Sequence, residues 1–161
     1  MTALSVVIPP RVADWLISDP EAQKLVSQLF SAIPTDAEIG IDPRGFDRLM
    51  GDRSKADELW HLLRAQPGLG PTKISKLLAA KRPHLLPIYD DVISSYLGTT
   101  SQTHWEDSWQ ALAASDIRER LEAIRSDAAT QVPSVDELSL LRVLDIVAWR
   151  AGKRASGRLA T

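Results

Sequence analysis

Prolines and glycines divide this chain of 161 residues into short segments in which apolar residues recur every three or four positions. That spacing places apolar side chains on one face of an α-helix, while proline and glycine mark where helices begin and end. The β-branched run "LSVVI" near the N-terminus is the strongest strand signal, and we expect it to form an N-terminal arm rather than a sheet. The pattern therefore predicts an all-α fold.

Several predicted helices carry starting signals. Asp19 precedes "PEAQKLVSQLFSAI", and Ser54 precedes a run in which Asp57 comes close to completing a capping box. Side-chain oxygens at such positions accept hydrogen bonds from the first free backbone N–H groups of a helix. The segment "HWEDSWQALAASDIRERLEAIRSDAAT" predicts two further helices that meet near Ser115, and we expect its hydroxyl to cap the second.

The last long segment, "VDELSLLRVLDIVAWRAG", is apolar on most sides and has a narrow polar stripe. Such a helix is largely buried. We expect Arg142 and Asp145 in the stripe to form an intrahelical ion pair, and Gly152 to end the helix. The size of the chain and its hydrophobic content of 44% predict a single helical domain over residues 1–151, followed by a basic, flexible tail at 152–161.

The tryptophans lie on apolar segments. Trp105 and Trp109 are about one helical turn apart, and Trp60 and Trp149 lie on apolar helices. We therefore expect these side chains to pack in the core rather than to form an aromatic cage around a base.

Composition excludes several classes of site. The chain has no cysteine and three scattered histidines, which predicts no disulfide, no iron–sulfur cluster and no metal site. An apolar run long enough to cross a membrane is absent, as is a basic segment leading into an apolar one, so we expect a cytoplasmic protein with no membrane contact. Since the net charge is −2, any nucleic-acid-binding charge must be local.

A helix–hairpin–helix is predicted at residues 55–80. An amphipathic helix is followed by the turn "PGLG", and Pro71 then stands where a second helix begins. Proline suits that position because its missing N–H would have no partner there. We expect Gly68 and Gly70 to adopt backbone angles that other residues resist.

Positive charge gathers around this predicted turn. Between Leu59 and Tyr89 the chain has five Lys or Arg residues and no Asp or Glu, so a net charge of −2 leaves −7 for the remainder. The first amides of a helix favour an anion such as phosphate. The predicted contacts to a nucleic-acid backbone, which are independent of base sequence, are Gly68, Gly70, Thr72, Lys73, Lys76, Lys81 and Arg82. The alternative is a tight corner whose charges are merely solvated.

The stretch "LRAQPGLGPTKISKLLAAK" resembles the hairpin of the helix–hairpin–helix DNA glycosylases, in which a turn of the type L-P-G-[VI]-G joins two helices. Those enzymes carry an essential aspartate after the second helix, and "IYDDVI" resembles that segment. Asp90 follows Gly70 by 20 residues, and Val92 stands where histidine is common. The pattern "KRPxLxPIYD" also resembles uncharacterised bacterial proteins, from which no activity follows.

The glycosylase resemblance implies a DNA-binding protein that hydrolyses the bond between sugar and a modified or damaged base, as in base excision repair. Asp90 would be the catalytic carboxylate, stabilising a transition state with oxocarbenium character. Bifunctional members carry a lysine two residues after the second glycine, where this chain has Thr72, so the resemblance implies a monofunctional enzyme. It also implies a monovalent cation on the hairpin carbonyls and no other cofactor.

Other functions remain open at this point. The chain could be a non-catalytic helix–hairpin–helix module that binds DNA, or an enzyme acting on a free nucleoside or nucleotide. It could also be a protein-interaction component, for instance of a toxin–antitoxin or defence system, whose basic stretch meets an acidic protein partner. For Asp90 itself, the alternative is a cap on a helix that opens at Asp91.

Overall fold

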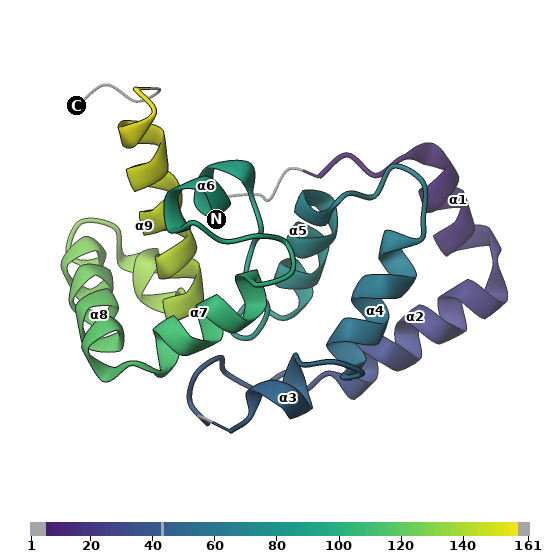
Figure 1. Cartoon of the computed structure of the whole chain (residues 1–161), viewed down its shortest axis with the longest axis horizontal. Coiled ribbons are helices and arrows are strands. Elements are labelled where there is room, and N and C mark those ends of the chain that lie inside the picture. The colour runs from purple at the N-terminus through teal and green to yellow at the C-terminus, as the bar shows by residue number, and fades with distance from the viewer. Residues whose placement is uncertain (1–5, 43, 158–161) are drawn as a thin grey trace.

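The structure of the protein is a computed structural model that describes residues 6–42 and 44–157. This part of the chain is helical and contains no strand, which confirms the predicted all-α class (Figure 1). In chain order the elements are α1 (Pro10–Ser18), α2 (Pro20–Ala32), α3 (Phe46–Leu49), α4 (Lys55–Arg64), α5 (Pro71–Lys81), α6 (Asp91–Leu97), α7 (His104–Ala113), α8 (Ser115–Ala129), the 3₁₀ helix η1 (Pro133–Glu137) and α9 (Leu140–Ala155).

Side-chain caps begin the helices where the sequence predicts them, with one exception. The Asp19 carboxylate accepts from the first free N–H groups of α2, and Ser54 Oγ accepts from the Asp57 N–H at 3.1 Å. The prediction for Ser115 is wrong, because Ser115 is the first residue of α8 and Ala114 holds the capping position without a side-chain bond.

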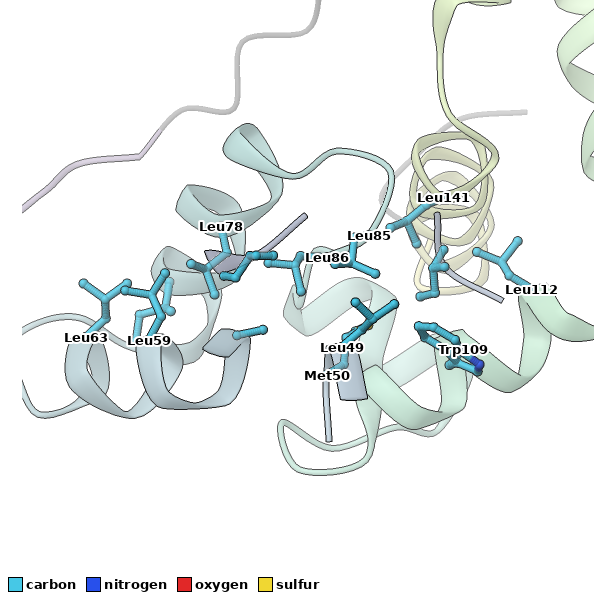
Figure 2. Packing of buried hydrophobic residues seen from close by; sticks show 14 of the residues in the cluster. Leu49, Met50, Leu59, Leu63, Leu78, Leu85, Leu86, Trp109, Leu112 and Leu141 are labelled. Atoms are coloured by element: carbon cyan, nitrogen blue, oxygen red, sulfur yellow. The ribbon is translucent and has the colours of Figure 1, made fainter. Parts of the chain in front are cut away.

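The helices form two groups that share a core. Figure 1 shows α1, α2, α4 and α5 on one side and α6 to α9 on the other, and neighbouring helices pack within each group. Leu85 and Leu86, both fully buried, lie between the two groups (Figure 2). They belong to a non-helical connection from α5 to α6, so the connection itself is part of the core and fixes one group against the other.

Helix α9 extends beyond the predicted end of the domain. Gly152 is buried inside α9, which continues to Ala155. A Cβ atom on Gly152 would lie 2.8 Å from Val92 Cγ1 and 2.9 Å from the Val92 carbonyl oxygen, so glycine allows α6 to approach α9 closely. The predicted helix stop at Gly152 is therefore wrong, and residues 152–155, which the sequence assigns to the tail, are helical. Residues 158–161 lie outside the described part.

The N-terminal arm reaches the turn between α4 and α5. Residues 6–9 are non-helical and lead into α1, while the first residues of the "LSVVI" run fall outside the described chain. Pro9 lies against Gly68, as its Cγ would be 2.9 Å from a Cβ on that glycine. None of the helices described here is both long and apolar enough to span a bilayer.

Candidate nucleic-acid interface

The two glycines of the turn between α4 and α5, residues 65–70, differ in their backbone angles and surroundings. Gly68 has a φ of +84° and lies against Pro9, so both its backbone angle and its surroundings require glycine. Gly70 has a φ of −86° and a ψ of 169°, which any residue adopts, and nothing lies within 4 Å of its Cβ position. The predicted conformational need for Gly70 is therefore wrong. The space beside it is open.

Helix α5 begins next to that open space. Pro71 is its first residue, as predicted, and Gly70 holds the capping position. No described side chain caps this end of α5, and the first hydrogen bond of the helix runs from the Ile74 N–H to the Gly70 carbonyl. The amides of the first turn are therefore available to an acceptor from outside the molecule.

Two positively charged side chains donate hydrogen bonds to carbonyl groups of the turn. Lys73 Nζ donates to the Gly68 carbonyl at 3.0 Å, and Arg64 Nη1 donates to the Leu69 carbonyl at 3.2 Å. These contacts hold positive charge at the turn. They also use two of the hairpin carbonyl groups, on which the glycosylase resemblance places a monovalent cation.

The remaining predicted contact residues lie in three different surroundings. Thr72 and Lys76 are half-buried in the first turns of α5, close to the glycine turn. Lys81 is exposed at the other end of α5, about 12 Å further along the helix axis. Arg82 donates from Nε to the Ile33 carbonyl at 2.9 Å and from Nη2 to the Phe30 carbonyl, so it binds the C-terminal end of α2 instead of facing solvent.

Asp90 is the N-cap of α6. Its Oδ1 accepts from the Val92 N–H at 2.9 Å, and its Oδ2 lies 4.0 Å from Lys76 Nζ. The side chain is 21% exposed. Asp91, the first residue of α6, points into solvent. The structure therefore brings Asp90 next to Lys76 of α5, whereas the side chain of Asp91 points away into solvent.

Two hollows stand out on the surface described, and Asp90 lines neither. The larger, of about 510 Å³, lies among α1, α2 and α4 and is lined by apolar residues such as Trp15 and Leu62 together with polar and charged ones such as Lys24. The other, of about 320 Å³, lies between α8 and η1 and is lined by charged residues including Arg118 and Glu122. His, Asp and Glu side chains of residues 6–42 and 44–157 form no group of three that could hold a metal.

A buried set of polar side chains, which we call the polar clamp, holds the chain just before Asp90. Residues 86–89 are non-helical and mostly buried, and their backbone groups bond to side chains of three helices. Ser75 Oγ in α5 donates to the Tyr89 carbonyl at 3.0 Å, and His104 Nε2 in α7 bonds to the Ile88 carbonyl at 3.0 Å.

The third helix, α9, completes the polar clamp with Arg142 and Asp145. Arg142 Nη2 donates to the Leu86 carbonyl at 2.5 Å, and Arg142 Nη1 lies 2.9 Å from Asp145 Oδ2. The predicted intrahelical pair is thus confirmed, but it is buried and also serves the backbone of another segment. The clamp fixes the position from which Asp90 starts α6.

Burial dominates the electrostatics of the clamp. It raises the pKa of Asp145 to about 7, although the Arg142 guanidinium and the Ile88 N–H both favour the charged carboxylate. Burial also lowers the pKa of Arg142, which Asp145 opposes. Both pKa shifts have the same cause, because keeping Asp145 and Arg142 charged away from water carries a desolvation cost.

His104 is neutral near pH 7. Burial lowers its pKa more than the Ile88 carbonyl and Asp107 raise it. Because a carbonyl only accepts, Nε2 carries the proton, and Nδ1 then accepts from Thr99 Oγ1 at 3.1 Å. Sequence reasoning missed His104 and Ser75. A serine among the apolar positions of α5 was the available signal for Ser75.

Comparison with known proteins gives a family but no activity. No curated protein and no solved structure matches the chain. A family model described as a family of unknown function (DUF6308) matches residues 1–152. Since this match covers most of the chain, the protein belongs to the DUF6308 family.

Proposed function

We propose that the protein binds the phosphate backbone of DNA through the α4–α5 turn, in the manner of the helix–hairpin–helix proteins that its sequence resembles. The observation that carries the proposal is the uncapped first turn of α5 beside the open space at Gly70, flanked by Lys73 and Lys76. Helix N-terminal amides and flanking lysines together favour a phosphate oxygen.

The distribution of charge supports the same surface. No carboxylate lies between Leu59 and Tyr89, so the turn and α5 keep a net positive charge even though the Asp90 carboxylate lies beside Lys76. Lys73 is held at the turn by its bond to the Gly68 carbonyl, which lowers the entropy lost when it meets a ligand. Arg82 is not included in the proposed contacts because its guanidinium is bound within the molecule.

Base excision by Asp90 is the second candidate function. It is supported by the place of Asp90 next to Lys76, with Oδ2 not used by the helix cap and the side chain partly exposed. In this reaction Asp90 would stabilise positive charge on the sugar and orient a water molecule. The use of Asp90 Oδ1 as the cap of α6 favours the binding function over the hydrolysis.

Binding can be tested by fluorescence anisotropy with a labelled duplex at about 50 mM salt. We expect measurable binding that weakens by more than about tenfold in the variant Lys73→Glu with Lys76→Glu. Arg44→Glu with Arg120→Glu is the matched control, because it changes the net charge equally at two exposed residues outside α4 and α5. Equal losses in both variants, or no binding by the native protein, would refute the proposal and favour an acidic protein partner.

Hydrolysis can be tested separately by the release of free base from duplexes that carry damaged bases. If Asp90 is catalytic, Asp90→Asn abolishes the release while DNA binding persists, because asparagine keeps the cap bond to the Val92 N–H. Release that continues in this variant removes Asp90 from the reaction.

A further inference from the structure

The C-terminal end of α9 presents an exposed indole among positive charges. Trp149 is 41% exposed, contrary to the core position predicted for it, and Lys153 Nζ lies 5.3 Å from the centre of its ring. Arg150 and Arg154 are exposed on the same part of the helix. The other tryptophans in the part of the chain described are buried or half-buried and pack against the core.

The charges at this end of α9 are not neutralised by their own helix. From Ser139 to Ala155 the only carboxylate is Asp145, which is buried beside Arg142. The helix dipole favours cations in the last turn of a helix, and this accounts for Lys153 and Arg154. It does not account for Arg150. The dipole gives no reason for an exposed tryptophan beside them.

This end of α9 is close to the lysines of α5. Gly152 in α9 lies against Val92 in the first turn of α6, and the N-cap of that turn, Asp90, lies 4.0 Å from Lys76. Ala79 of α5, Ile93 of α6 and Ala148 of α9 belong to one small buried cluster, so α5 and α9 lie close to each other beside α6. Figure 1 shows the α4–α5 turn, α6 and the end of α9 along the same edge.

We propose that Trp149, Arg150, Lys153 and Arg154 bind unpaired nucleotides, with a base stacked on the indole and phosphates held by the three cations. Aromatic side chains interleaved with Lys and Arg bind single strands in this way, because every base has a flat face that can stack. The inference rests on the proposed DNA binding by the α4–α5 turn. Together the two surfaces fit DNA in which a duplex continues into a single strand.

Three probes test the inference with the full chain. They are a blunt duplex, an oligothymidylate of about 12 nucleotides, and the same duplex with a thymidylate overhang. We expect the overhang to tighten binding and to quench tryptophan fluorescence. In Trp149→Leu the oligothymidylate should bind about tenfold to a hundredfold more weakly and the quenching should be lost, while blunt-duplex binding is unchanged.

Trp149→Phe is the conservative variant, because it keeps an aromatic face and should retain most of the affinity for the overhang. The inference is overturned if Trp149→Leu binds the oligothymidylate normally, or if both variants weaken the blunt duplex equally. It is also overturned if polyglutamate competes as well as the oligothymidylate. If the blunt duplex does not bind but the oligothymidylate does, through Trp149, the proposal for the α4–α5 turn fails and the single-strand site stands.

Discussion

Removing the buried carboxylate of the polar clamp should remove a pH dependence of stability. Burial raises the pKa of Asp145 from 3.8 to about 7, and a shift of this size corresponds to roughly 4 kcal/mol. Because the folded protein holds this proton more tightly than the unfolded chain, the contribution of Asp145 is fully favourable below about pH 4. It is lost as the pH rises to about 7.

The variant Asp145→Asn cannot titrate at this position and keeps the shape of the side chain. The stability of the native protein relative to this variant should therefore fall by up to roughly 4 kcal/mol between about pH 4 and about pH 8. Comparison with the variant cancels the contributions of other titrating groups, such as His104. The absolute stability of the variant at one pH is less informative, since asparagine also changes the surroundings of Arg142.

Urea unfolding followed by tryptophan fluorescence across this pH range measures the difference directly. Glu119→Gln, an exposed carboxylate in α8, controls for the loss of a negative charge. If the difference in unfolding free energy between the native protein and Asp145→Asn does not change with pH, the reasoning is refuted. A difference that rises with pH would mean that the Arg142 guanidinium outweighs burial and lowers the pKa of Asp145.

The glycines give three further predictions. Gly152→Ala should lower the free energy of unfolding by about 1–3 kcal/mol, because the new methyl group meets the backbone of Val92, as thermal unfolding can measure. Gly68→Ala should cost at least about 1 kcal/mol, since its positive φ strains any side chain and Pro9 lies in the way. Gly70→Ala should leave the melting temperature unchanged, because its backbone angles suit any residue and its Cβ position is open. A lower melting temperature for Gly70→Ala would contradict the open space described there.

Features set by one turn of chain could be predicted from the sequence. The caps at Asp19 and Ser54 and the proline that opens α5 each depend on a side chain and the backbone within three residues of it. The all-α class follows from the same local periodicity. The error at Ser115 is also local, since the helix begins one residue earlier than a serine cap would require.

Features that depend on packing between distant segments could not be predicted. Gly152 reads as a helix stop in sequence, but its role comes from α6, which crosses α9 at that point. Trp149 lies on a mostly apolar helix and is nevertheless exposed, because the buried face of α9 is the one that carries Asp145 and Gly152. The polar clamp joins three helices to a single non-helical segment, and no local sequence pattern encodes contacts between such distant parts of the chain.

The candidate site combines both kinds of feature. The turn, its proline and its lysines could be found from spacing and charge alone. The binding of Arg82 to α2 could not, because its partners Phe30 and Ile33 lie far away in the chain. The use of Asp90 as a helix cap was one of two readings of its sequence, and the structure shows the cap bond to the Val92 N–H.

The salt dependence of duplex binding tests the central claim most directly, namely that Lys73 and Lys76 contact backbone phosphates. Each phosphate contact by a lysine contributes about 0.9 to the slope of log K against log salt concentration. In Lys73→Gln with Lys76→Gln the slope should therefore become shallower by about 2. An unchanged slope in this variant would contradict the account, because the phosphate contacts would then lie elsewhere.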